Sequence, residues 1–444
     1  MASTAVRPVE ERLYEILTGE PDDRVCLDIP ESSCREQPRN FLTHVASLVA
    51  TRTADGLMDA RLVLAWLLGT LGAPAFMVGM LVPIREAGAL LPQLVIAAAI
   101  RALPVRKWVW AAASAVQGLC AIGIAAAALL LEGAAAGWAI LALLALLAVA
   151  RSAGSISHKD VLGKTVAKAT RGTVSGTASS VSAVLILVFG ALLGTGVLER
   201  SIGVISAALC VAGLLWIVAA LLFASLAEEP GATEGGRNAL TMAIAQFGLL
   251  RDDPQLTRFT IVRCLLLAVT LAPPFLVALE GGASNAAGVA LGPLVIASAL
   301  AKISSSYVWG RLSDRSSRRV LIVSAWIGAL SLAIAALVGA GFTAWAGITI
   351  TSFLVVPALV FVLTIAEQGV KLGRTTHVVD MANAERRGAY TALSNTISGV
   401  IMLGAGVFGI LAQMYGTVAV LALLGVLCLL GVWLASGLEE VQQA

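Results

Sequence analysis

The sequence predicts an all-α polytopic membrane protein with twelve transmembrane helices in two pseudo-symmetric six-helix bundles. Its 444 residues are 58% hydrophobic and only 13% charged, and the mean hydropathy is +0.90. Apolar runs recur along the chain, and each is long enough to cross the ~30 Å hydrocarbon core of a bilayer. The halves also repeat: residues 162–165 (LGKT) return as 372–375 (LGRT), and Pro83 and Arg101 have counterparts in Pro293 and Arg311. This constant offset indicates a duplicated six-helix unit.

The order of segments follows from composition. Residues 1–42 form a charged tail without a hydrophobic signal core, so no cleaved signal peptide is predicted. An N-terminal bundle covers 43–224, a linker marked by Pro230 and Gly231 covers 225–256, a C-terminal bundle covers 257–437, and a short tail covers 438–444. Hydropathy places the twelve spans near residues 43–68, 75–100, 108–131, 135–157, 172–197, 201–224, 257–280, 285–309, 319–340, 343–366, 389–413 and 416–437.

The positions of Lys and Arg predict the orientation of these spans. The loops after the second, fourth, sixth, eighth and tenth spans carry most of them, whereas the opposite loops are short and hold Glu132, Glu199 and Glu280 with a single arginine, Arg200. Positive charge marks the cytoplasmic side, so both termini and the linker are expected in the cytoplasm. The Ala/Leu/Gly-rich composition favours a bacterial inner (plasma) membrane.

Several other classes of protein are disfavoured. A net charge of +3 without a basic-aromatic face gives nucleic acid nothing to bind. The cysteines lack metal-ligand spacing, and no Ser-His-Asp or cofactor motif is present, so we expect no enzyme, no metal and no cofactor. A phosphate-binding loop for ATP is also absent. The expected partners are the lipid bilayer, a small-molecule substrate and a proton, and a monomer is expected.

Residues 310–319 (GRLSDRSSRR) form a basic turn between the eighth and ninth spans. This turn resembles the signature of the major facilitator superfamily, and the twelve spans, central linker and basic inner loops over 43–437 resemble it too. Leu147, Arg151 and Gly154 are similar to the superfamily's fourth-helix arginine motif, with the glycine one place early. The first half departs from the pattern, because residues 99–107 lack the glycine and the acid. The fifth span has Gly190 but not the proline of drug antiporters.

The resemblance implies a conformational latch at this turn. Gly310 is expected to let the eighth helix end tightly against a neighbour. Asp314 is expected to accept hydrogen bonds from a helix N-terminus or to pair with Arg315 or Arg318. Contacts of this kind hold one conformation and break in another.

Charges placed inside the spans point to a polar pathway, because a charge in the membrane faces a cavity or a partner. In the first span, Asp55 and Asp59 lie on one helical face, with Arg61 nearby. The second span has Arg85 and Glu86 near mid-membrane. The predicted substrate or proton pathway comprises Asp55, Asp59, Arg61, Arg85, Glu86, Gln93, Arg151 and Asn395. Glu86 and then Asp59 are the favoured proton carriers.

The second half is poorer in such charges. Val295 and Ile296 replace Arg85 and Glu86, and Lys302 and Glu367 are expected near cytoplasmic ends, where long side chains reach water. We therefore expect the first half to carry the site and the second to form the opposite wall. A purely structural alternative pairs Asp59 with Arg61 and Glu86 with Arg151.

Two functions remain open. The first is a secondary active transporter that moves a small solute by alternating access and is driven by protons. The second is a transporter-like receptor or assembly factor that acts through its cytoplasmic N-terminal tail. The buried charges favour the transporter, since a receptor does not need them. The sign of the substrate stays open, with a slight preference for an organic anion or zwitterion.

Overall fold

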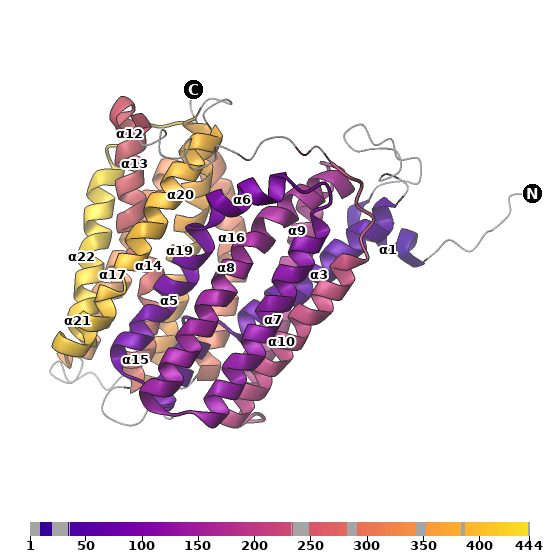
Figure 1. Cartoon of the computed structure of the whole chain (residues 1–444). Coiled ribbons are helices and arrows are strands. Elements are labelled where there is room, and N and C mark those ends of the chain that lie inside the picture. Colours follow the sequence, from indigo (N-terminus) through magenta and orange to yellow (C-terminus); the bar gives the residue numbers. More distant parts are fainter. Residues whose placement is uncertain are drawn as a thin grey trace, which may run out of the picture.

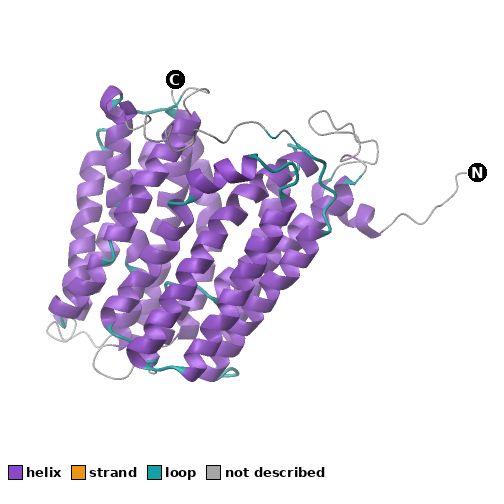
Figure 2. Ribbon diagram, in the orientation of Figure 1, coloured by secondary structure: helices purple, strands orange, loops and turns teal. Residues whose placement is uncertain are grey.

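The computed structural model describes residues 9–19, 34, 36–231, 233, 248–281, 291–342, 352–382 and 387–442. The regular structure of these residues is entirely helical, without a strand (Figure 2). Eleven helical spans among the described residues are long and apolar enough to cross a membrane, and the first of the twelve predicted spans is not one of them. The chain is a multi-pass membrane protein, and the predicted all-α polytopic fold is confirmed.

The first half contains α1 to α10 and is arranged as a bundle (Figure 1). Its first helix, α1, is short, lies before the first span, and packs against α3 through Tyr14 and Phe41, whose rings meet edge to face at 5.1 Å. The predicted first span is divided into α3 and α4. The helices are α1 (Val9–Thr18), α3 (Gln37–Leu57), α4 (Val63–Thr70), α5 (Ala75–Leu90), α6 (Gln93–Arg101), α7 (Lys107–Leu130), α8 (Gly133–Thr165), α9 (Arg171–Gly194) and α10 (Ile202–Ala224).

The second half contains α12 to α22. Three consecutive short helices, α13 to α15, together make its first span, Pro254–Leu279. The tenth span differs most from the prediction, because the helix reaches Asp380 and not 366. The helices are α12 (Leu249–Asp252), α13 (Pro254–Leu265), α14 (Leu267–Leu271), α15 (Pro273–Gly281), α16 (Leu291–Arg315), α17 (Ser317–Gly339), α19 (Ser352–Asp380), α20 (Arg387–Gly404), α21 (Val407–Tyr415) and α22 (Thr417–Ala435).

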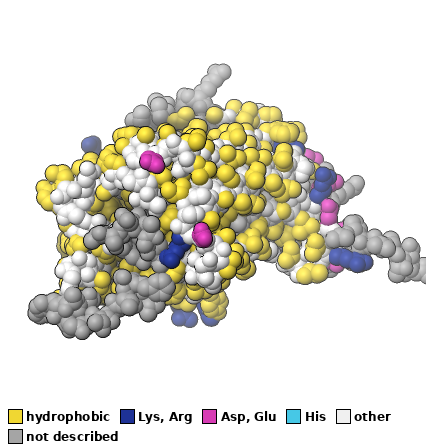
Figure 3. All heavy atoms as spheres, turned by 90° about the horizontal axis from the view of Figure 1, so that it is seen from below, with side chains coloured by type: hydrophobic (Ala, Val, Ile, Leu, Met, Phe, Trp, Pro, Cys, Tyr) yellow, Lys and Arg dark blue, Asp and Glu magenta, His cyan; other side chains and the backbone are white. Residues whose placement is uncertain are grey.

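The bundle has two unlike sides. We call the side where α10 and α22 end the tail side, and the opposite side the loop side. On the loop side, five connections turn at a glycine with positive φ, a backbone conformation that side chains disfavour. These glycines are Gly72, Gly133, Gly196, Gly341 and Gly416. The loop side is largely apolar and shows few charged side chains (Figure 3).

Large apolar side chains also cover the outside of the bundle. Leu119, Leu221 and Trp433 are 63%, 69% and 71% exposed, although they belong to long apolar helices. Exposing this much apolar surface to water is unfavourable, whereas contact with lipid tails carries no such penalty. The exposed apolar belt therefore agrees with the membrane assignment.

Two equivalent contacts join the two halves, in addition to a contact between α4 and α15. In each of the two equivalent contacts the second span of one half meets the fifth span of the other: α5 packs against α20 and α21, and α16 packs against α9. Glycines make the closest approach. A Cβ added to Gly79 would lie 2.4 Å from the Cα of Gly409, and one added to Gly292 would lie 2.3 Å from the backbone nitrogen of Gly194. Both pairs lie toward the loop side, so the halves are closed together there.

Candidate functional site

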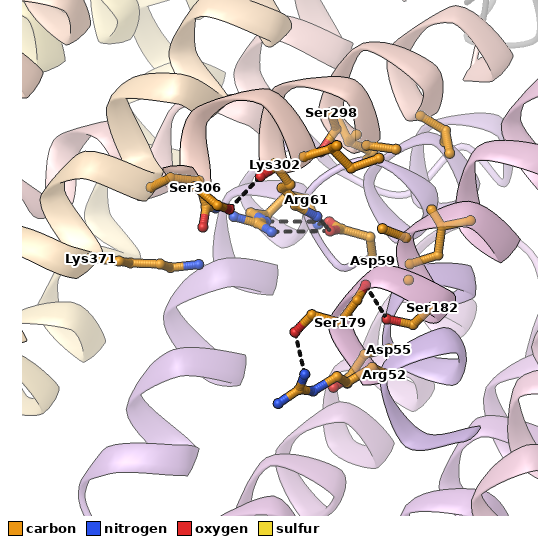
Figure 4. A pocket seen from close by; sticks show the side chains of 18 of the residues that line it. Arg52, Asp55, Asp59, Arg61, Ser179, Ser182, Ser298, Lys302, Ser306 and Lys371 are labelled. Carbon is orange, nitrogen blue, oxygen red and sulfur yellow. Dashed lines mark hydrogen bonds and ion pairs between the residues drawn. The ribbon is translucent and has the colours of Figure 1, made fainter. Parts of the chain in front are cut away.

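A cavity of about 900 Å³ lies between the halves (Figure 4). Its walls come from α3, α5, α8 and α9 of the first half and from α16 and α19 of the second. Ser179 on α9 and Ser306 on α16 line it and are exposed, and both lie toward the tail-side ends of their helices. The cavity is thus on the tail side of the glycine contacts.

The break between α3 and α4 places two of the predicted residues at this cavity. Asp59 and Arg61 lie in the turn that separates the helices, residues 58–62. One carboxylate oxygen of Asp59 accepts a hydrogen bond from the Arg61 backbone nitrogen at 2.8 Å, and the other lies 3.1 Å from its guanidinium. The carboxylate therefore satisfies backbone that the interrupted helix leaves free. The predicted pairing of Asp59 with Arg61 is confirmed.

Ion pairs from this turn cross to the second half. Arg61 pairs with Glu367 of α19, a residue that is only 2% exposed. Lys302 of α16 approaches Asp59 at 3.8 Å, and Lys371 lies 2.8 Å from Glu367. Lys302 and Glu367 were expected at cytoplasmic ends, and this is wrong: α19 extends to Asp380, so Glu367 lies in its middle. The second half contributes charge to the site as well as a wall.

A second cluster lies within the first half. Asp55 on α3 accepts a hydrogen bond from Arg85 of α5 at 2.8 Å and pairs with Arg151 of α8. Of the two pairs in the structural alternative, that of Glu86 with Arg151 is therefore wrong. Glu86 lines the cavity but forms no ion pair or hydrogen bond with any described residue, although Arg61 and Arg151 are within electrostatic reach. It is the cavity carboxylate without a direct partner in the described chain.

The cavity wall carries an excess of positive charge. Among the described residues that line it, six are basic and three are acidic. The basic residues are Arg52, Arg61, Arg85, Arg151, Lys302 and Lys371, and the acidic ones are Asp55, Asp59 and Glu86. Arg52 has no carboxylate partner among the described residues, since it donates to the Ser175 carbonyl at 2.6 Å and contacts the Ser179 hydroxyl.

Two residues of the predicted pathway lie elsewhere. Gln93 begins α6, just beyond the break that ends α5, and is not among the residues that line the cavity. Asn395 on α20 accepts a hydrogen bond from Arg263 at 2.6 Å, and Arg263 also donates to Ser394 at 2.9 Å. Asn395 therefore solvates a buried arginine of α13 and does not line the cavity. Sequence spacing placed Gln93 wrongly because it assumed one continuous second helix.

The predicted latch contacts its own half in this conformation. Helix α16 continues to Arg315, and Ser316 caps α17 by accepting a hydrogen bond from the Arg319 backbone nitrogen at 3.1 Å. Arg318 donates to the Ser436 carbonyl at the end of α22. The side chain of Asp314 lies outside the described residues. A Cβ added to Gly310 would meet no described atom within 4 Å, which corrects the tight helix end expected there.

Sequence reasoning missed an acidic contact that occurs at the same corner of both halves. Glu228, just after α10, has a fully buried side chain that accepts hydrogen bonds from the Arg106 and Lys107 backbone nitrogens and from Lys164. In the second half, Glu440 accepts a hydrogen bond from Ser316 at 2.6 Å. A partial signal was in the sequence, because SLAEE at 225–229 resembles SGLEE at 436–440, although the first glutamate of the pair makes the contact in the first half and the second glutamate makes it in the second half.

Known proteins resemble this chain in structure. No family profile matches its sequence, and no curated protein matches it. Solved structures do match. A mutant of the nucleoside transporter NupG superposes with a TM-score of 0.70 at 14% identity, over 90% of this chain and 100% of that one.

A POT family transporter in complex with 5-aminolevulinic acid superposes with a TM-score of 0.67 at 10% identity, over 90% of this chain and 95% of that one. The chain has the major facilitator fold. The fold that the signature turn implied is confirmed. At these identities the likeness establishes the major facilitator fold alone, so any activity has to be argued from the cavity.

Proposed function

We propose that this protein is a secondary active transporter that moves a small solute across the membrane by alternating access, coupled to protons. The observation that carries the proposal is the charged cavity between the two halves. Charge within a membrane-spanning bundle is costly unless it is used or paired. The fold adds support, since the solved structures that share it include a nucleoside transporter and a POT family transporter in complex with a thioalcohol conjugated peptide. The tail side is proposed to face the cytoplasm, and the membrane is proposed to be a plasma (inner) membrane.

The arrangement suits two alternating openings. The tail side gives access to the cavity, whereas the glycine contacts close the loop side. A rocking of the halves would separate Gly79 from Gly409 and Gly194 from Gly292, and would close the tail side. The ion pair between Arg61 and Glu367 connects one half to the other, so a rocking of the halves would change the distance between its partners. Its strength then depends on which side is open.

Glu86 is the proposed proton carrier. It lines the cavity without an ion-pair partner in the described chain, whereas Asp55 and Asp59 each contact two cationic groups. A proton on Asp55 or Asp59 would break an existing pair, but a proton on Glu86 would not. Glu86 is therefore the carboxylate that can bind and release a proton with the least disturbance of the network.

The test is proton movement in proteoliposomes, followed with a pH-sensitive dye while a panel of small solutes is added. Solute-triggered alkalinisation outside, lost in Glu86→Gln, is expected for symport, and acidification outside would indicate antiport. Glu132→Gln, which changes an exposed loop-side carboxylate, is the matched control and should behave as wild type. Transport by Glu86→Gln at the wild-type rate with its proton signal intact would contradict the role of Glu86.

The receptor alternative makes a different prediction. A partner would bind the N-terminal tail, of which α1 packs on α3, and no solute would cross. Binding of a protein partner together with the absence of any solute flux would favour it. The six basic and three acidic residues in the cavity would then lack a purpose, which is why transport is the better-supported proposal.

A further inference from the structure

We propose that the ligand of this cavity is an amphipathic organic anion: a small molecule with a carboxylate or phosphate group and an apolar body. The inference rests on the proposed function and goes beyond it by naming the class of substrate. Three features of the wall carry it: the sign of its charge, the basic side chains that reach the cavity, and the aliphatic lining residues that two neighbouring helices supply.

The basic residues of the cavity outnumber the carboxylates that could neutralise them. Six basic and three acidic residues line the cavity, and Glu367 lies behind the wall as a fourth carboxylate. Counting that buried carboxylate, two positive charges remain without a counterpart among the described residues. Uncompensated charge in a bundle surrounded by lipid is unfavourable, and a bound anion would supply the missing negative charge. A cation would add to the excess.

Several donors are placed to receive an oxyanion. In Figure 4, Lys371 extends from α19 and Arg52 from α3 into the space between the halves. One guanidinium nitrogen of Arg85 also has no hydrogen-bond partner among the described residues, but it is buried and would reach a ligand only after the side chain moved. The Arg151 side chain is 38% exposed at the cavity, although it pairs with Asp55. Guanidinium groups bind carboxylate and phosphate oxygens through two parallel hydrogen bonds, which favours these ligands over chloride.

Most apolar residues of the cavity belong to two helices, although Lys302 also lies on one of them, α16, and Arg52 donates to the Ser175 carbonyl of the other, α9. The apolar residues come mainly from α9 and α16, two adjacent helices that join the halves, whereas most of the charges come from α3, α5, α8 and α19. The apolar lining residues on α9 and α16 are Ala183, Val184, Ile186, Val295, Ala299 and Ile303. One end of a bound molecule would thus face cations and the other would face aliphatic side chains. This selects for an amphipathic anion over a small inorganic one.

The test uses probes that share one body and differ in charge. Thermal unfolding of the purified full chain in detergent is measured with 2-naphthoate, 2-naphthyl phosphate, neutral 2-naphthamide and cationic 2-naphthylmethylamine. We expect a concentration-dependent rise in Tm with one or both anions in the micromolar to low millimolar range. The amide and the amine should give at least tenfold weaker effects. Acetate should also be at least tenfold weaker than naphthoate, since it lacks the apolar body.

Variants place the effect in the cavity. Lys371→Gln and Arg52→Gln are expected to weaken the response to the anion at least tenfold. Lys371→Arg should retain it, which separates loss of charge from loss of folding. Arg200→Gln removes an exposed arginine outside the cavity and should leave the response unchanged.

Each result bears on the proposal. Stronger stabilisation by the amine than by the anions would overturn it, and so would no stabilisation by either anion. An equal loss in Arg200→Gln would also overturn it, because the binding would then not be specific to this site. The assay needs no gradient, so its failure is distinct from failure of the transport proposal. Anion binding without flux would retain the ligand class and reject transport, whereas coupled flux of a cationic solute would do the reverse.

Discussion

The Asp55 carboxylate forms ion pairs with guanidinium groups from two different helices, those of Arg85 on α5 and Arg151 on α8. It therefore links three helices of the first half beside the cavity. Replacing it with Asn would leave two cations facing each other with one counter-charge fewer. We expect Asp55→Asn to lower the free energy of unfolding by roughly 2–4 kcal/mol, because removal of one partner leaves buried charge uncompensated. The measurement is the denaturation midpoint of the purified chain in detergent.

A second substitution tests whether the loss comes from uncompensated charge. Asp55→Asn combined with Arg151→Gln should recover part of the loss, since the remaining Arg85 then has less repulsion to overcome. Glu132→Gln, at an exposed position, should change stability little. A loss in Asp55→Asn no larger than that in Glu132→Gln would show that the pairs do not stabilise the fold.

At this scale the sequence was informative about which residues form the site and less so about their partners. Asp55 and Asp59 were predicted to share one helical face; both line the cavity, but Asp59 does so from the turn after α3 and not from its helical face. The predicted partner of Arg151 was incorrect, because the pattern of residues on a helix face does not determine how α8 is rotated against α3. Glu367 was assigned to a helix end because hydropathy falls at charged residues, whereas α19 continues beyond it.

At the scale of elements, the break between α3 and α4 determines the position of the central charges. Hydropathy cannot detect this break, because residues 43–68 remain apolar enough on average to be read as one helix. The feature that marks it is local: Asp59 caps the turn with its own side chain. The division of α5 from α6 was also invisible to hydropathy, and it moved Gln93 away from the cavity.

The N-terminus of α7 gives an element-scale prediction. Glu228 accepts hydrogen bonds from the first backbone nitrogens of α7 and from Lys164 of α8, with distances of 2.7–3.0 Å. Its negative charge lies beside the positive end of the helix dipole, which is a favourable interaction. We expect Glu228→Gln to lower the free energy of unfolding by about 1–2 kcal/mol, since the amide keeps one acceptor but loses the charge. Urea or thermal unfolding measures this.

A matched variant tests whether the charge acts through this contact. Lys164→Gln should cost less than Glu228→Gln, because the backbone donors of α7 would still be satisfied. The double variant should cost less than the sum of the two single ones. Strict additivity would mean that Glu228 and Lys164 do not interact, contrary to the 2.9 Å distance between their charged atoms.

For the whole molecule, most of the architecture could be predicted from the sequence. The repeat through Pro83 and Pro293 predicted two related halves, and the structure shows their second and fifth spans meeting in two equivalent contacts. The sequence could not show which side is closed. That property depends on contacts between residues far apart in the chain, such as Gly79 with Gly409, and a single sequence does not report such pairs.

The central claim is that the two sides of the cavity open alternately, and labelling with a membrane-impermeant maleimide tests it most directly. The chain would carry serine in place of its six cysteines and one new cysteine at a time. Ser180→Cys lies in the exposed part of the cavity, and Met80→Cys lies where α5 packs on Gly406 near the loop side. We predict that Ser180→Cys reacts from the tail side and that Met80→Cys is protected.

A wedge at the loop side should reverse this pattern. Gly409→Leu introduces a side chain where a Cβ alone would lie 2.6 Å from the Phe76 carbonyl oxygen, so it should hold the halves apart there. We predict that Met80→Cys then reacts from the loop side and that Ser180→Cys loses most of its reactivity. Gly404→Leu, at a position where an added Cβ meets no described atom within 4 Å, is the control and should change neither. Unchanged labelling of Ser180→Cys after the loop side has opened would contradict alternating access.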